Sequence, residues 1–166
     1  VYAVKFCPDR TDYSLVVAQP LKDCKIHTVI IMQRPMSEGW AKLSKWLIDR
    51  WRNCAKIIID GATGQAILYE ELTRAGVAPK KIIQPNMKEI VAAHQFMYDG
   101  IQKGELSHYN QPLLNQTVRV TKMRQMGRYG GFGWESMSKE MNVSALDAAT
   151  FACWGQKVFP KKVATG

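Results

Sequence analysis

The sequence predicts one α/β domain built on a mixed sheet. Runs of β-branched and aromatic residues separated by a short turn open the chain, which is typical of antiparallel strands that follow one another directly. After Ser37 the apolar residues recur at helical spacing and alternate with short apolar runs, which is typical of βα units that add parallel strands. We therefore expect about five strands, first three antiparallel strands and then parallel βα units, flanked by helices.

The antiparallel part is expected in three runs, at 1–7, 13–19 and 26–33. Pro8, Asp9 and Asp12 lie at the link between the first two runs, and these residue types favour a hairpin turn. Strands joined by such short links pair with their neighbours in sequence, so the runs predict a meander.

The βα part begins with an amphipathic helix around Leu43 and Leu47, for which Ser37 is the expected N-cap. A short apolar run at 56–60 predicts a strand buried on both faces, and this strand ends on Asp60. The elements expected next are a helix at 65–75 closed by Gly76, a strand at 80–84 and a helix at 87–103.

The last third is expected to hold two helices around a glycine-rich segment. Residues 111–126 fit a helix that carries Arg119, Lys122 and Arg124 on its outer face. Segment 128–134 holds too many glycines for a helix, which predicts a loop or a bent strand. The elements expected at the end are a helix from Ser144 to about Trp154, a domain boundary at 158 and a frayed tail at 159–166.

The composition bounds the class of protein. The chain has 166 residues, 46% of them hydrophobic, which suits one soluble domain with its own core. Its apolar runs are too short to cross a bilayer, and the charges of Lys5, Asp9 and Arg10 interrupt the start in a way that signal peptides do not. The net charge of +9 attracts polyanions, but such a charge also serves solubility and does not by itself establish nucleic-acid binding.

Several kinds of site are excluded by missing motifs. The four cysteines, Cys7, Cys24, Cys54 and Cys153, form no CxxC pair, which predicts buried small residues in place of a zinc site or disulfides. The chain contains neither GxxxxGK[ST] nor GxSxG. A nucleotide-hydrolysing P-loop and a serine hydrolase are therefore not expected.

Separated aspartates are the first candidates for chemistry. Asp60 ends a buried strand, at the edge where open α/β sheets place their sites, although an aspartate there also serves as a turn or N-cap residue. Asp9 and Asp12 lie in a turn, where local hydrogen bonding commonly explains aspartate. Asp147 follows Ser144 at capping-box spacing. Carboxylates from separate elements can bracket two Mg²⁺-type ions about 4 Å apart, so their combination favours a metal site.

A basic strip is the second candidate, formed by Arg119, Lys122, Arg124 and Arg128 with the aromatic residues Tyr129, Phe132 and Trp134 between or beside them. This composition suits a surface that follows phosphates and stacks on bases, and it equally suits a solvated helix face followed by a glycine-rich core loop. His108 is expected to be exposed near a strand end, where it could touch a phosphate. His94 lies on the apolar stripe of its helix, which fits a core or rim position.

Taken in order, several segments resemble the C-terminal nuclease domain of the large terminase subunit of tailed bacteriophages. The resemblance spans nearly the whole chain and rests on the order and spacing of the segments. They are 2–9 (YAVKFCPD), 57–61 (IIIDG), 93–94 (AH), 104–108 (GELSH), 111–113 (QPL), 130–133 (GGFG), 144–149 (SALDAA) and 152–155 (ACWG).

This resemblance implies a ribonuclease H-like fold and an endonuclease that uses two Mg²⁺ or Mn²⁺ ions to cut concatemeric phage DNA during packaging. It implies double-stranded DNA as the substrate and an ATPase domain in cis upstream of this segment. The portal and the small terminase subunit are the further partners that it implies, in the cytoplasm of the bacterial host and without a membrane.

Carried over to matching positions, the acidic cluster of the family falls on Asp60 and Asp147. Many relatives have the first carboxylate within the first strand, where this chain has Lys5. Asp9, expected two pleats further along the same face, is the substitute, and Asp12 is held in reserve as a metal ligand. Lys5 would oppose metal binding electrostatically or hold a phosphate.

Two other functions stay open. A catalytically degenerate module would contact DNA, the motor or the portal without cutting, and Lys5 is the feature that favours it. A junction resolvase or an integrase-type recombinase would use the same fold and prefer branched DNA. The lack of an obvious separate DNA-recognition motif makes this last function less attractive.

Overall fold

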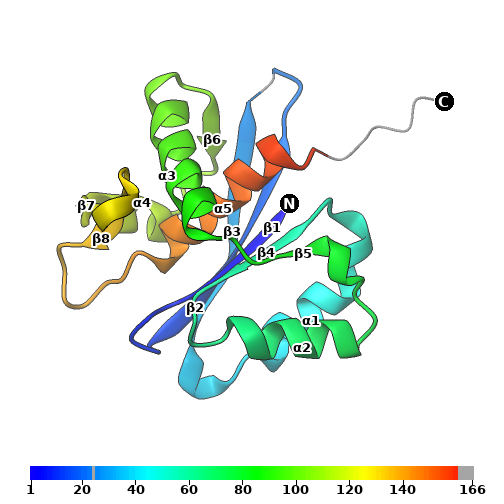
Figure 1. Ribbon diagram of the computed structural model, residues 1–166. Coiled ribbons are helices and arrows are strands. Elements are labelled where there is room, and N and C mark those ends of the chain that lie inside the picture. The colour runs from blue at the N-terminus through cyan, green and yellow to red at the C-terminus, as the bar shows by residue number, and fades with distance from the viewer. Residues whose placement is uncertain (24, 161–166) are drawn as a thin grey trace.

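The computed structural model describes residues 1–23 and 25–160, with all their side chains except that of Tyr129. Its centre is a mixed six-stranded sheet with the strand order β5-β4-β1-β2-β3-β6 (Figure 1). A separate two-stranded hairpin consists of β7 and β8. The strands are β1 (Tyr2–Phe6), β2 (Asp12–Pro20), β3 (Ile26–Pro35), β4 (Ile57–Asp60), β5 (Ile82–Ile83), β6 (Leu106–His108), β7 (Thr121–Gln125) and β8 (Phe132–Ser136).

The topology of the sheet confirms the predicted mixture of antiparallel and parallel strands. β1 pairs antiparallel with β2, and β2 pairs antiparallel with β3, as a meander requires. β4 lies parallel to β1, and β5 lies parallel to β4. Within this sheet the sequence did not predict β6, which pairs parallel with β3 through only three register positions and is too short to show a hydrophobic period.

The helices are α1 (Ala41–Arg50), α2 (Gln65–Arg74), α3 (Met87–Gln102), α4 (Pro112–Arg119) and α5 (Ser144–Val158). Alternate residues of β1 enter two different cores, because successive side chains of a strand point to opposite faces. Val4 packs with leucines of α1 and α2, whereas Ala3 packs with residues of α3, α4 and α5. The sheet is therefore covered by helices on both faces.

Short 3-10 turns connect several elements, at Met36–Glu38, Trp51–Asn53, Pro79–Lys81 and Gly127–Tyr129. One of them corrects a predicted helix start. Ser37 lies inside the first 3-10 turn and does not cap α1, which begins at Ala41. The start of α3 is better defined, because Asn86 and Glu89 form a reciprocal capping box.

The last helix lies closest to the sheet. Every residue of α5 from Ser144 to Gly155 is buried. A Cβ added at Gly155 would come within 2.4 Å of Ile58 Cδ1, so a larger residue there would push α5 away from β4. At the other end of α5, Asp147 in the first turn lies beside Lys5 near the end of β1.

The chain leaves β4 through a turn that only glycine fits. Gly61 has φ = 108°, and a Cβ on it would lie 2.3 Å from the carbonyl oxygen of Phe6. Backbone with positive φ is accessible to glycine without steric cost. Gly61 therefore keeps the ends of β1 and β4 together, directly after Asp60.

The predicted helix at 111–126 is wrong in its second half. α4 ends at Arg119, and residues 121–125 form β7, which pairs antiparallel with β8. The glycine-rich segment after it contains a 3-10 turn and then the strand β8, so the alternative of a strand holds for 132–136. A polar and basic stretch such as Thr121–Gln125 has weak periodicity of either kind, and pairing with β8 decides its structure.

Cys7, Cys54 and Cys153 are buried, as predicted, and Cys24 lies outside the described residues. Most of the predicted tail, residues 161–166, also lies outside them. No helix in the described part of the chain is both long and apolar enough to span a membrane.

Candidate functional site

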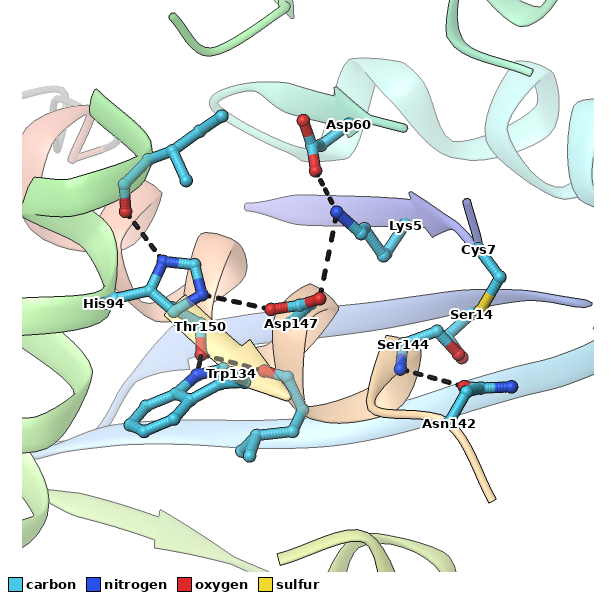
Figure 2. A network of polar contacts seen from close by, with 12 residues as sticks. Lys5, Cys7, Ser14, Asp60, His94, Trp134, Asn142, Ser144, Asp147 and Thr150 are labelled. Carbon is cyan, nitrogen blue, oxygen red and sulfur yellow. Dashed lines mark hydrogen bonds and ion pairs between the residues drawn. The ribbon is translucent and has the colours of Figure 1, made fainter. Parts of the chain in front are cut away.

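Lys5 and Asp60 are neighbours because β1 and β4 run parallel in register, with Lys5 opposite Asp60. Both side chains project from the face of the sheet that carries Ala3 and Ile58, which is the face under α5. The Lys5 ammonium forms an ion pair and hydrogen bond with Asp60 Oδ2. Figure 2 shows this contact at the ends of the two strands.

The second carboxylate comes from the opposite end of the sequence. Asp147 lies in the first turn of α5, and its Oδ2 is 3.7 Å from Lys5 Nζ. The Lys5 ammonium thus lies between the carboxylates of Asp60 and Asp147 (Figure 2). The side chains of Asp60 and Asp147 are only 12% and 10% exposed, so these charges interact with little screening by water.

His94 supports Asp147 from α3. Its Nε2 lies 3.0 Å from Asp147 Oδ1, and its Nδ1 lies 2.7 Å from the carbonyl oxygen of Ile90. Both ring nitrogens thus face acceptors, and neutral imidazole can donate to only one of them. His94 holds Asp147 in place and adds a polar ring to the wall of the site.

The charge of Lys5 is stabilised by its surroundings. Burial alone would lower the pKa of Lys5, but the negative charges of Asp147 and Asp60 outweigh burial and raise it above its usual value. The ring of Phe151 lies 5.9 Å from the ammonium. Lys5 is therefore a permanent cation at neutral pH.

These side chains line a hollow of about 370 Å³. Its walls come from the ends of β1 and β4, from α3 and α5, and from the β7–β8 hairpin. Arg124 of β7 lines it as well, so a second cation faces the same space. The hollow therefore presents two cationic side chains, Lys5 and Arg124, beside two carboxylates, Asp60 and Asp147.

Asp9 does not join Asp60 and Asp147. The prediction that Asp9 lies two pleats beyond Lys5 on the same face is wrong, because β1 ends at Phe6 and the chain turns. The exposed Asp9 carboxylate accepts hydrogen bonds from the backbone N–H and hydroxyl of Thr11, at 3.1 Å and 2.8 Å. Its position is that of a local turn residue.

Asp12, held in reserve as a metal ligand, also lies elsewhere. Its carboxylate accepts hydrogen bonds from Gln33 Nε2 at 2.5 Å, Asn142 Nδ2 at 2.7 Å and Ser144 Oγ at 3.1 Å. Asp9 and Asp12 line a different hollow from the one that contains Asp60 and Asp147. The structure thus brings together two of the four predicted aspartates.

The predicted capping box at the start of α5 does not form. Val143 is the N-cap, and the Ser144 hydroxyl contacts Ser14 and Asp12. Asp147 is therefore released from a capping role, and its side chain faces Lys5 and His94.

The four residues of the basic strip are exposed, but they do not share one helix face. Arg119 ends α4 and lines a hollow together with His108 of β6. Lys122 and Arg124 lie on β7, and Lys122 pairs with Glu135 across the hairpin at 3.1 Å. Arg128 lies in the turn between β7 and β8. Arg124 is the one placed at the Asp60–Asp147 hollow.

Phe132 and Trp134, two aromatic residues of the same strip, are not exposed stacking groups, and the side chain of Tyr129 lies outside the described part of the structure. Phe132 is buried, and the Trp134 indole donates a hydrogen bond to Thr150 Oγ1 at 2.8 Å. Both rings pack around His94, with centroids 6.3 Å and 5.5 Å from the imidazole. They belong to the wall behind the site, and the interpretation of this segment as part of the core holds for these two residues.

His94 is the site residue that sequence reasoning missed. Its place on an apolar helical stripe predicted a core or rim position, which is correct for its 3% exposure. Its contact with Asp147 depends on how α3 crosses α5, and no spacing in the sequence encodes that crossing.

The arrangement does not fit the two divalent ions that the family resemblance implies. Mg²⁺ and Mn²⁺ prefer several carboxylate oxygens, but the Lys5 ammonium already contacts both Asp60 and Asp147. Within residues 1–23 and 25–160, no group of three or more His, Cys, Asp or Glu side chains could hold a metal ion. The donor set is two carboxylates with a cation between them.

The order of the sheet and the position of α5 are those of a ribonuclease H-like fold, which confirms the fold predicted from the resemblance. Among solved structures, the HK97 bacteriophage large terminase superposes with a TM-score of 0.64 and 9% identity over 93% of this chain. The large terminase nuclease from thermophilic phage G20c superposes with a TM-score of 0.63 and 14% identity, covering 94% of this chain and 82% of that one. The same nuclease with bound magnesium has a TM-score of 0.59 and 12% identity, covering 94% of this chain and 81% of that one.

The chain therefore has the fold of phage large-terminase nuclease domains. It spans only 38% of the HK97 large terminase, so the match concerns one part of that protein. No family model matches the chain, and no curated protein matches its sequence.

Proposed function

We propose that this chain is the nuclease domain of a phage large terminase subunit and that it acts on the backbone of double-stranded DNA during genome packaging. The observation that carries the proposal is the convergence of Asp60 and Asp147 from distant parts of the chain, in a hollow that also presents Lys5 and Arg124. The fold shared with terminase nucleases supports the same role. An ATPase domain in cis, the portal and the small terminase subunit are the partners this role would have, in the host cytoplasm.

The activity that the geometry supports best is binding of the DNA backbone. Arg124 and the neighbouring Lys122 and Arg128 are exposed, and the net charge of +9 adds long-range attraction for a polyanion. A phosphate that enters the hollow would meet Arg124 and Lys5. The buried carboxylates keep the Lys5 ammonium fixed at the bottom of that hollow.

Cleavage of concatemeric DNA is the second candidate activity, and the pairing of Asp60 with Asp147 favours it. Two hydrolytic ions, Mg²⁺ or Mn²⁺, would need the oxygens that Lys5 now contacts. Asp9 would not contribute to such a site, because it lies in a separate turn. An endonuclease would therefore depend on movement of Lys5 away from Asp60 and Asp147.

DNA binding is tested by titrating a labelled duplex and following fluorescence anisotropy at several salt concentrations. Arg124→Ala should weaken binding about 3- to 10-fold and reduce the slope of log K against log salt by about 1, since it removes one phosphate contact. The matched control is Lys42→Ala, because Lys42 is exposed on α1 on the opposite face of the sheet. Equal affinity in Arg124→Ala and the wild type would remove the hollow from the DNA interface.

Cleavage is tested on supercoiled plasmid with Mg²⁺ or Mn²⁺. Nicking by the wild type that disappears in Asp60→Asn would establish the endonuclease, whereas salt-sensitive binding without nicking in either metal would support the binding module. A preference for branched over linear DNA would point to a junction resolvase instead.

A further inference from the structure

The hollow already contains a cation that belongs to the protein. Asp60 Oδ2 and Asp147 Oδ2 both face the Lys5 ammonium, and Asp147 Oδ1 faces His94 Nε2. Three of the four carboxylate oxygens thus have a nitrogen partner. A divalent ion would have to displace these partners before it could bind.

The position of Lys5 makes this competition direct. A metal ion that bridged Asp60 and Asp147 would occupy the space between the two carboxylates, which is where the ammonium lies. An ammonium and a divalent ion at contact distance repel each other strongly in a buried site. The Lys5 side chain is only 15% exposed, so little water screens this repulsion.

We propose that Lys5 is the resident cation of this site, which takes the place of a divalent ion and keeps Mg²⁺ and Mn²⁺ from binding in the DNA-free domain. Replacing Lys5 by a carboxylate would convert the same hollow into a divalent-metal site. This proposal concerns occupancy of the site by ions and does not rest on the proposed role in packaging.

The backbone is already arranged for such a conversion. Residues 5 and 60 are directly paired on neighbouring parallel strands, and strands in a sheet lie about 4.8 Å apart. Lys5→Asp would therefore place a carboxylate beside Asp60 and below Asp147. Three carboxylates from β1, β4 and α5 would then surround one space, and affinity for hard divalent ions rises with the number of charged oxygen ligands.

Isothermal titration with MnCl₂ tests the proposal on the DNA-free domain. The wild type should show no saturable binding, whereas Lys5→Asp should bind Mn²⁺ at least about tenfold more tightly. Thermal unfolding gives an independent readout, since a hundredfold excess over Kd should raise the Tm of Lys5→Asp by about 5 to 10 °C and leave that of the wild type unchanged. Lys5→Arg keeps the cation and is the matched control, which should not bind.

Two results would overturn the proposal. One is saturable Mn²⁺ binding by the wild type that Asp60→Asn abolishes, because Lys5 would then not exclude the metal. The other is a folded Lys5→Asp variant without Mn²⁺ binding. If Lys5→Asp fails to fold even with Mn²⁺, the test uses Lys5→Asn, which removes the positive charge and offers an amide oxygen. A folded Lys5→Asn variant that binds Mn²⁺ no better than the wild type also contradicts the proposal. If the wild type does not bind DNA in the anisotropy titration, the proposed packaging role is contradicted, but the Mn²⁺ titration still tests the role of Lys5.

Discussion

Two aspartate clusters lie beside the sheet, and they differ in the charge of their partners. Asp12 accepts hydrogen bonds from the neutral groups of Gln33, Asn142 and Ser144. Asp60 and Asp147, by contrast, face the ammonium of Lys5, and Asp147 also faces an imidazole. Both clusters contain aspartates that the sequence marks as metal-ligand candidates.

The difference shows what decides the role of a buried carboxylate. Amide and hydroxyl donors around Asp12 join the start of β2 to β3 and to the start of α5. A single cation between Asp60 and Asp147 can in principle be exchanged for another cation. The first cluster is therefore structural, and the second has the form of a ligand site with a built-in occupant.

The largest expected effect on stability concerns the cluster of Lys5, Asp60, Asp147 and His94, the cation-centred cluster. Asp147→Ala should lower the free energy of unfolding by about 3–5 kcal/mol, because it leaves Lys5 with one carboxylate partner and removes the partner of His94 Nε2. Urea denaturation monitored by circular dichroism measures this. Asp49→Ala is the control, since the Asp49 pair with Lys45 is exposed and should change stability by less than about 1 kcal/mol. Equal losses in the two variants would mean that Lys5, Asp60 and Asp147 interact no more strongly than a surface pair.

A smaller effect is expected from the neutral cluster. Asp12→Ala should lower the free energy of unfolding by about 2 kcal/mol, because it leaves the amides of Gln33 and Asn142 without their acceptor. The affinity of Asp12→Ala for DNA should stay within about twofold of the wild type, since Asp12 lies outside the Asp60–Asp147 hollow. A loss of DNA affinity as large as that of Arg124→Ala would show that the two clusters work together and would break the distinction between them.

The sequence predicts the two carboxylates of the site better than the side chains that contact them. Asp60 is found because a buried strand that ends on a carboxylate has a clear pattern, and the structure places it at the end of β4. Asp147 is found through the resemblance, and the structure brings it to Asp60. Their convergence depends on α5 lying across the sheet, which the apolar character of that helix makes predictable.

The remaining contacts depend on details that the sequence does not carry. Asp9 fails as a candidate because β1 ends at Phe6, and strand ends are set by turn geometry and pairing more than by residue type. β7 was predicted as helix because its pairing with β8 overrides the weak helical pattern of residues 121–125. The sequence shows a lysine at position 5, where many relatives have a carboxylate, but only the structure shows that its ammonium lies between Asp60 and Asp147.

The smallest expected effect is a difference between the two clusters in how their contribution to stability changes at alkaline pH. Cys7 donates to Asp12 Oδ1 at 2.9 Å, and burial, together with that hydrogen bond, raises the pKa of the Cys7 thiol from 9.0 to about 12. A group whose pKa is raised in the folded state contributes its full stability below its pKa in the unfolded chain. This contribution is lost as the pH rises toward the pKa in the folded state, so that of Cys7 starts to fall near pH 9. The pKa of Lys5 is also raised, but from 10.5, so the contribution of Lys5 starts to fall only at higher pH.

Between pH 9 and pH 10 the wild type should therefore lose about 1 kcal/mol more stability than Cys7→Ser, because serine keeps a donor for Asp12 and does not titrate in this range. Urea denaturation of both proteins at the two pH values measures the difference, and the contribution of the buried Cys153 cancels because both proteins contain it. Lys5→Met should change the result little in this window, since the Lys5 ammonium stays charged throughout. If Lys5→Met removed the pH dependence and Cys7→Ser did not, the cation-centred cluster would be the one that responds to alkaline pH.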